Sequence, residues 1–144
     1  MSRKPDRHAF AADALAHARV ARLATAGADG PHLVPVVFAQ SDGALWVPVD
    51  GKPKRHMRLK RLENIRANPR VSLLIDHYEE DWRALWWVRV DGRASVVERE
   101  DAGFDEALAA LRGKYPQYAS VPVTGAIRID IDNVSRWRAD GPAG

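Results

Sequence analysis

The segment VARLATAGADGPHLVPVVFAQSDGALWVPV, residues 20–49, decides the fold of this chain. Three stretches within it carry the apolar and β-branched patterns of strands, and two stretches rich in Gly, Asp or Ser separate them. Two hairpins within about thirty residues indicate antiparallel β structure. The predicted strands cover residues 20–25, 32–39 and 44–49, and the predicted turns cover residues 26–31 and 41–43.

Two prolines, Pro35 and Pro48, interrupt these strand patterns. Proline has no backbone N–H and cannot donate to a strand ladder. Each proline should therefore lie at a sheet edge, at a strand end or at a bulge. A strand that is broken in this way leaves backbone groups available to a ligand, so the surroundings of Pro35 are of interest as a binding surface.

The rest of the chain alternates between short helical patterns and strand patterns. Asp6 is a candidate N-cap for the first helix, and Asn68-Pro69 ends the second. Asp91-Gly92 predicts a bulge or bend inside the longest strand. The polar and aromatic residues 76–83 predict a loop. The predicted helices cover residues 7–18, 57–67 and 101–112, and the further strands cover residues 71–75, 84–98 and 127–132.

These elements predict a mainly β (α+β) fold, in which six strands form an antiparallel barrel flanked by two to three short helices. A length of 144 residues fits one domain over residues 1–144. The sequence has no cysteine, which excludes disulfides and thiolate chemistry. No apolar run approaches the roughly 20 residues of a membrane span, and the charged start does not resemble a signal peptide. We therefore expect a cytoplasmic protein that does not bind membranes.

Charge is concentrated in residues 52–61, KPKRHMRLKR, where six of ten residues are Lys or Arg. Such side chains neutralise phosphates, and arginine binds them through two parallel hydrogen bonds. A solvated charged face or a nonspecific nucleic-acid patch is the alternative interpretation. The overall net charge of +3 does not mark a nucleic-acid binder.

Aromatic residues gather in a second segment, where Trp82, Trp86 and Trp87 lie within six residues. Trp86 and Trp87 should point to opposite faces of a strand, so at most one of them meets a given ligand. The five histidines show no metal-ligand spacing, and no nucleophile motif or nucleotide-binding glycine motif occurs. We therefore predict no metal site and single out no catalytic residue.

Several of these segments together resemble a known family. The segments LATAGADGPHLVPVVFA (23–39), ALWVPVDGKPK (44–54) and LKRLENIRANPRVSLLID (59–76) resemble the pyridoxamine-5'-phosphate-oxidase-like split β-barrel family. The segment DHYEEDWRALWWVRVDGRASVV (76–97) resembles a subgroup assigned as F-420-dependent. The resemblance covers residues 18–100 and implies a split barrel that forms a homodimer, with cofactor sites at the subunit interface.

The resemblance also implies which residues bind the cofactor. Its phosphate would be held by Lys52, Lys54 and Arg61, with Arg58 and Lys60 as near alternatives, and many relatives have lysine in place of Arg61. Its ring would lie along the strand, and Trp86 or Trp87 of the second subunit would close the site. The residues implied for the ring are Val34, Pro35, Val36 and Val37, together with Trp87.

The implied function is an oxidoreductase that uses the deazaflavin coenzyme F-420 and transfers a hydride to or from a small molecule. An FMN-dependent oxidoreductase of the same fold is an alternative, and a non-catalytic flavin-binding or carrier protein is another. A nucleic-acid-binding barrel that uses residues 52–61 is a fourth interpretation, and we expect no nucleic-acid partner. The fold and the cofactor do not identify the substrate.

Overall fold

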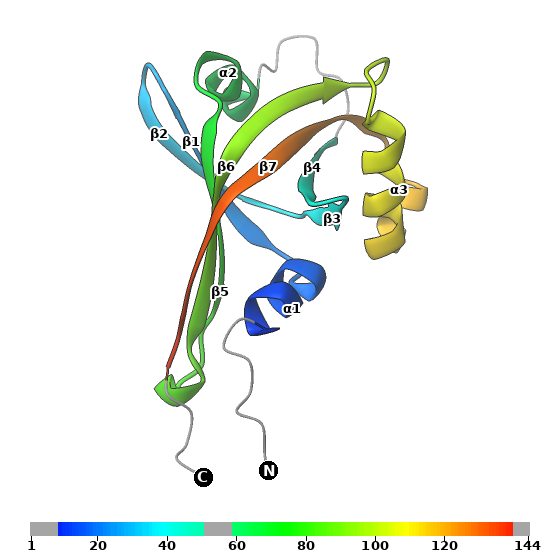
Figure 1. Cartoon of the computed structure of the whole chain (residues 1–144). Coiled ribbons are helices and arrows are strands. Elements are labelled where there is room, and N and C mark those ends of the chain that lie inside the picture. The colour runs from blue at the N-terminus through cyan, green and yellow to red at the C-terminus, as the bar shows by residue number, and fades with distance from the viewer. Residues whose placement is uncertain (1–8, 51–58, 140–144) are drawn as a thin grey trace.

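The computed structural model describes residues 9–50 and 59–139. Within these ranges the chain forms seven strands, three α-helices and two short 3-10 helices (Figure 1). The helices are α1 (Ala9–His17), α2 (Lys60–Ala67), η1 (Trp82–Ala84), α3 (Phe104–Lys114) and η2 (Pro116–Ala119). The strands are β1 (Ala21–Gly27), β2 (Gly30–Val36), β3 (Ala39–Ser41), β4 (Ala44–Asp50), β5 (Arg70–His77), β6 (Trp86–Glu98) and β7 (Val123–Arg138).

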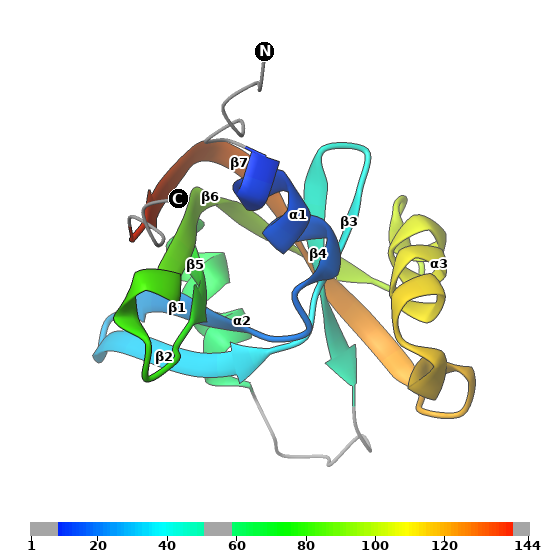
Figure 2. The ribbon, with the colours of Figure 1, turned by 90° about the horizontal axis from the view of Figure 1, so that it is seen from below.

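All seven strands belong to one antiparallel sheet in the order β2-β1-β5-β6-β7-β4-β3. The sheet curls into a barrel whose edge strands, β2 and β3, do not pair with each other (Figure 2). Only Val37 and Phe38 separate β2 from β3, so the chain itself passes from one edge of the sheet to the other. This open arrangement confirms the predicted split barrel, with seven strands where six were predicted.

The additional strand arises because the predicted strand 32–39 is two strands with a break at Phe38. The backbone N–H of Phe38 donates to the hydroxyl of Tyr115 (3.2 Å), and its carbonyl accepts from the ammonium of Lys114 (2.9 Å). Side chains at the end of α3 therefore form hydrogen bonds with the backbone N–H and carbonyl that a continuous strand would pair with a neighbouring strand. Such distant partners are not visible in a local sequence pattern.

The larger hydrophobic core fills the barrel interior. Leu23, Leu73 and Val90 are completely buried there. Helices α1 and α2 lie at opposite ends of the barrel (Figure 1) and bury Leu15 and Ile65, respectively, against the same core. The two helices therefore cover the two ends of the barrel. The charged residues of α2 lie at one of these ends.

A second core lies between the outer surface of the sheet and α3, which packs against the side of the barrel (Figures 1 and 2). Phe104 and Leu111 of α3 are buried there against Trp46, Val97 and Ala126 of the sheet. The predicted helix over residues 101–112 is thus confirmed, although it begins later because Gly103 has a left-handed backbone (φ 95°).

The irregular positions agree with the sequence analysis. Pro35 lies in the edge strand β2, and Pro48 lies in β4 beyond the residues that pair with β3. The β6–β7 register shifts between Asp91 and Gly92, and β7 carries the additional residue Asp132 at that point. A Cβ atom at Gly92 would lie 2.3 Å from a backbone oxygen of β7, so the close approach of the two strands requires glycine here.

Some boundaries were predicted wrongly. Asp76 and His77 belong to β5 and not to a loop, and β7 spans residues 123–138 where a strand over 127–132 was predicted. The bulge in β7 explains the second error, because it interrupts the alternation of buried and exposed residues. The second helix begins at Lys60, since Leu59 has an extended backbone, and residues 57–58 lie outside the described ranges.

Candidate cofactor site

Helix α2 lies across the β1–β2 hairpin and is held there by two polar contacts. The side-chain amide of Asn64 donates to the hydroxyl of Thr25 (3.0 Å), and both residues are buried. The ammonium of Lys60 lies 2.5 Å from a carboxylate oxygen of Asp29 in the hairpin turn. A Cβ atom at Gly27 would lie 2.1 Å from the amide oxygen of Asn64, so only glycine permits this approach. The helix and the hairpin therefore form one fixed corner, which we call the β2–α2 corner.

The ion pair in this corner changes the predicted role of Lys60. The hydrogen bond from Lys60 and its charge lower the pKa of Asp29, and the same hydrogen bond raises the pKa of Lys60. Both side chains are exposed, so the pair contributes little to stability. The ammonium of Lys60 is nevertheless engaged by a carboxylate, which makes it a weaker candidate for a phosphate ligand than its neighbour Arg61.

Arg61 occupies the face of α2 that turns toward the barrel. It precedes Asn64 and Ile65 by three and four residues, and both of these are buried. Arg61 is itself partly buried, and its Nε atom is fully buried without a hydrogen-bond partner in the described part of the chain. A buried guanidinium N–H that finds no acceptor is costly, and it suits a ligand that brings one.

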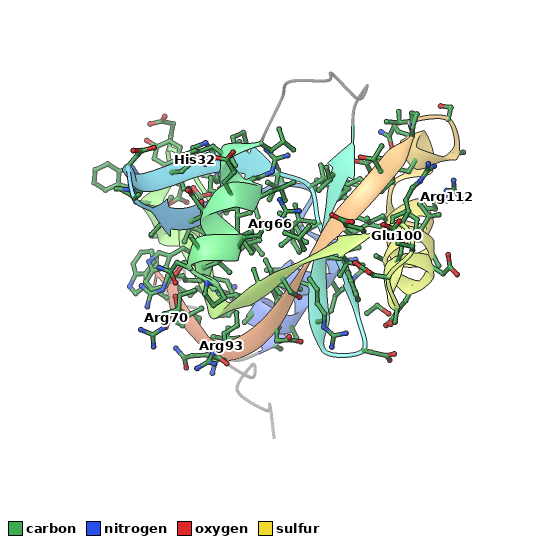
Figure 3. The ribbon with its side chains drawn as sticks, turned by 90° about the horizontal axis from the view of Figure 1, so that it is seen from above. His32, Arg66, Arg70, Arg93, Glu100 and Arg112 are labelled. Atoms are coloured by element: carbon green, nitrogen blue, oxygen red, sulfur yellow. The ribbon has the colours of Figure 1, made fainter. Side chains whose placement is uncertain are left out.

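A second nitrogen atom of this kind belongs to His32, which Figure 3 labels on β2. Residues alternate along β2, and His32 is directed inward with Val34 and Val36. It lies directly opposite Thr25, the residue that Asn64 of α2 contacts. The Nδ1 atom of His32 is buried and has no hydrogen-bond partner among residues 9–50 and 59–139. Sequence reasoning did not select His32, because the burial of a single ring nitrogen is a property of the folded barrel and not of a local pattern.

The segment predicted to support a ring, Val34 to Val37, does not present a single surface. Val36 is buried and Val34 is partly buried in the barrel core, Pro35 points outward, and Val37 packs against the second core. The available feature is the backbone edge, since β2 pairs only with β1. The surface that was predicted to support the ring is therefore only an unpaired strand edge beside the β2–α2 corner.

The two adjacent tryptophans point to opposite faces of β6, as predicted. Trp86 faces inward, where its ring stacks on His77 at 5.8 Å and meets Phe10 edge-on at 6.1 Å. Trp87 lies on the outer face of the sheet, opposite Trp137 of β7. Trp86 is thus occupied by packing within its own chain, whereas Trp87 lies on the face of the sheet that is turned away from the barrel core.

A pair of adjoining grooves lies between α2 and the end of β6. Their volumes are about 340 and 220 Å³, and they share the lining residues Arg66, Val96 and Glu98. A guanidinium nitrogen of Arg66 lies 3.4 Å from a carboxylate oxygen of Glu98. Figure 3 labels Arg66 on α2. No motif singled out these residues, and none of Val34 to Val37 lines either groove.

Three other predicted phosphate ligands, Lys52, Lys54 and Arg58, lie outside the described residues. In the described ranges, no three His, Asp or Glu side chains gather in a way that could hold a metal ion. None of the helices in these ranges is long and apolar enough to cross a membrane. The structure therefore places Lys60 and Arg61 on a helix that is held against the β1–β2 hairpin, and His32 and the predicted residues Val34 to Val36 lie on β2 of that hairpin.

Comparison with known proteins places this split barrel in a family. The sequence profile of the pyridoxamine 5'-phosphate oxidase family matches residues 8–138, and the chain belongs to that family. It is 30% identical to a FAD-binding protein from Mesorhizobium loti, over 91% of this chain and 92% of the other, with a TM-score of 0.67. No protein of curated function matches the chain.

Two further solved structures share the fold. A conserved hypothetical protein from Mycobacterium tuberculosis is 24% identical, with 96% of this chain and 90% of the other covered and a TM-score of 0.70. The haem storage protein of Vibrio cholerae is 19% identical, with 96% and 95% covered and a TM-score of 0.67. At these identities the likeness concerns the fold alone.

Proposed function

We propose that this chain binds a flavin-type cofactor at the β2–α2 corner and catalyses hydride transfer with it, the cofactor being the deazaflavin coenzyme F-420. The observation that carries this proposal is the pair of buried nitrogen atoms, Nε of Arg61 and Nδ1 of His32, without partners in the described residues. Membership of the oxidase family and the FAD-binding relative support a flavin-type ring.

The residues of the corner fit a cofactor that carries a phosphate. Arg61 offers N–H donors from a partly buried position, and a charge-assisted hydrogen bond to phosphate is about twice as strong as a neutral one. His32 offers a second nitrogen on the neighbouring strand. Lys60 adds positive charge while it stays paired with Asp29. Lys52, Lys54 and Arg58 remain predicted ligands from the basic segment that precedes α2.

When it is bound, the cofactor supplies the carbon that gives or takes the hydride. The residues of the chain supply binding and position. Arg61 and His32 hold the anionic end, and the edge of β2 from Val34 to Val37 supports the flat ring. The apolar core beneath that edge excludes water from the side that faces the barrel. Catalysis then depends on positioning and not on an acid–base pair of the protein.

The choice of F-420 rests on two features of the sequence. Residues 76–97 resemble the F-420-dependent subgroup, and the six cations in residues 52–61 suit an anionic glutamylated tail. FMN is the second candidate cofactor, and the FAD-binding relative favours a flavin over a deazaflavin. Both candidates carry a phosphate and a flat three-ring system, so the affinities measured for each of them separate the two.

We also propose that the protein is a homodimer that uses the outer face of the sheet. Leu33, Leu74 and Trp137 on β2, β5 and β7 are 68%, 36% and 45% exposed, although they are large and apolar. No helix of the described ranges covers this part of the sheet, since α3 packs against the opposite end of β6 and β7. Exposed apolar side chains of this size favour an interaction surface, here one that also carries the charged residues Arg22 and Arg89 beside Leu74. Trp87, on the same face, would then approach the site of the partner.

The test is a titration of the purified protein with F-420 and with FMN, read by fluorescence and calorimetry. We expect micromolar F-420 binding with little FMN binding. The Arg61→Ala variant should bind the cofactor about ten- to a hundredfold more weakly, which corresponds to about 1.5–3 kcal/mol for one charged hydrogen bond. The Arg61→Lys variant should keep most of the affinity. Arg112→Ala, on α3 at the far side of the molecule (Figure 3), is the matched control and should bind normally.

Each contrary result has a defined meaning. Tighter binding of FMN would replace the deazaflavin with a flavin. Unchanged affinity in Arg61→Ala would show that the phosphate lies elsewhere. If neither cofactor binds, the proposed function is wrong. A carrier without turnover would bind reduced cofactor tightly and fail to accelerate its oxidation by any member of a substrate panel.

A further inference from the structure

Lys114, the last residue of α3, has surroundings unlike those of an ordinary surface lysine. Its ammonium donates to the carbonyl of Phe38 at 2.9 Å. It also lies 3.9 Å from the centre of the Phe38 ring and 5.4 Å from the centre of the Tyr115 ring. The side chain is partly buried. Lys114 therefore has lost much of its hydration shell and has gained aromatic faces and one carbonyl in return.

A second cation, Arg19, belongs to this cluster. The guanidinium of Arg19 lies 4.5 Å over the Tyr115 ring, and it donates to the backbone carbonyl of Lys114 at 3.2 Å. In the described part of the chain, no carboxylate forms an ion pair with Lys114 or Arg19. Two positive side chains thus share one aromatic cluster without an acid to balance them.

Two features of these surroundings favour the neutral amine of Lys114, while the hydrogen bond to Phe38 and the two rings favour the ammonium. Burial and, secondly, the charge of Arg19 lower the pKa of Lys114 to about 8. Lys60 is the opposite case, because its hydrogen bond to Asp29 raises its pKa. Near neutral pH, a drop of this size increases the fraction of neutral amine about three hundredfold over an unperturbed lysine. Only the neutral amine has a free electron pair with which to attack an electrophile.

We propose that Lys114 is a site of covalent acylation by small acyl phosphates. The ammonium first releases a proton to water. The Nζ electron pair then attacks the carbonyl carbon of the acyl phosphate, and an N–C bond forms. The C–O bond to the phosphate breaks, and inorganic phosphate leaves with that electron pair. The remaining excess proton on Nζ passes to water, and the product is a neutral amide.

The neutral product suits the cluster better than the ammonium does. An amide carries no charge, so its repulsion with Arg19 disappears and less hydration has to be given up. It keeps one N–H, which can still donate to the carbonyl of Phe38. What is lost is the attraction between the ammonium and the rings of Phe38 and Tyr115. This inference is independent of the proposed function, since it involves neither Arg61 nor the β2 edge.

The experiment treats the folded protein with acetyl phosphate between pH 7 and 9.5 and follows each lysine by peptide mass spectrometry. Lys60 is the internal comparator. At pH 7.5 we expect Lys114 to react roughly tenfold faster than Lys60 or more, with a rate that levels off above pH 8. In the Arg19→Gln variant the reaction at Lys114 should slow, and its pH midpoint should rise.

A denaturant control makes the test independent of the variants. In 8 M urea the preference for Lys114 should disappear, because both lysines are then fully hydrated. Equal rates at Lys114 and Lys60 in the folded protein would overturn the proposal. A preference that persists in urea would also overturn it, since local sequence and not the fold would then be the cause.

Discussion

The hydroxyl of Tyr115 lies 3.2 Å from the backbone nitrogen of Phe38 and 3.0 Å from its carbonyl oxygen. Phe38 is completely buried at the point where the chain passes from β2 to β3. The Tyr115 side chain, at the end of α3, thus forms hydrogen bonds with both the backbone N–H and the carbonyl of Phe38, which connects the two edges of the sheet. This contact fixes the geometry of the split in the barrel.

Replacing Tyr115 with phenylalanine removes the hydroxyl and with it the hydrogen bonds to the Phe38 backbone. The backbone N–H of Phe38 then stays buried without an acceptor, which costs about 1–3 kcal/mol of unfolding free energy. The measurement is urea unfolding followed by circular dichroism. Tyr78→Phe is the control, because the Tyr78 ring is exposed and its change should stay within about 0.5 kcal/mol. Equal effects of the two variants would show that the Tyr115 hydroxyl contributes nothing special.

The lowered pKa of Lys114 predicts how stability depends on pH. Because its folded pKa is about 8 and its ordinary value is 10.5, the folded state binds fewer protons than the unfolded state between these values. Stability should therefore rise from pH 8 to pH 9.5. Tyr115, whose pKa burial raises, opposes this trend only nearer pH 10. In Lys114→Met the rise should vanish, and urea midpoints measured across this range decide the point.

Asn64 and Gly27 should be energetically coupled. Gly27→Ala places a methyl group against the Asn64 amide and should destabilise the protein, whereas Asn64→Ala removes the hydrogen bond to Thr25 and should cost about 1–3 kcal/mol. In the double variant the clash is absent, so the two costs should not add. A double-mutant cycle from chemical unfolding measures this, and strict additivity would contradict the contact.

His32→Leu should separate stability from binding. An apolar side chain of similar size removes a buried nitrogen that lacks a partner, so the cofactor-free protein should be as stable as the wild type or more stable. The affinity for the cofactor should nevertheless fall, because the nitrogen that would meet the ligand is gone. Thermal melts and the fluorescence titration test both parts. A variant that loses stability and keeps full affinity would assign His32 to packing alone.

Trp137→Glu should dissociate the proposed homodimer, since it replaces one of the large exposed apolar side chains of the outer sheet face with a charged one. Sedimentation velocity at micromolar concentration gives the readout. Val121→Glu is the control, because Val121 is also exposed but lies beside the other end of β7. A wild-type protein that sediments as a monomer would exclude the dimer directly.

The sequence predicted the elements of this fold well, because strand alternation and turn chemistry are local. The β1–β2 and β3–β4 hairpins and the bulge at Asp91-Gly92 all follow from residues that are near each other in the chain. The break at Phe38 was not predictable in this way. It depends on Tyr115 and Lys114, which reach Phe38 only after α3 has packed on the sheet.

The candidate site divides along the same line. The charge of residues 52–61 and the strand pattern of residues 34–38 drew attention to these segments, and the family resemblance singled out Arg61. The pairing of Lys60 with Asp29 requires α2 to lie on the hairpin, and the burial of the His32 nitrogen is likewise a property of the folded barrel that no local pattern indicates. The contacts between elements that are distant in sequence, such as the pairing of Lys60 with Asp29, are therefore the part of the site that could not be predicted from the sequence.

The strand order bears on how the chain is made. β3 and β4 are synthesised early, yet they join the remaining strands only through β7, at residues 123–130. While the ribosome is still producing the second half, this hairpin has an edge that no other strand covers, and an unprotected edge favours association between nascent chains. The barrel can close only when almost the whole polypeptide has emerged, and such long-range pairing makes folding slow.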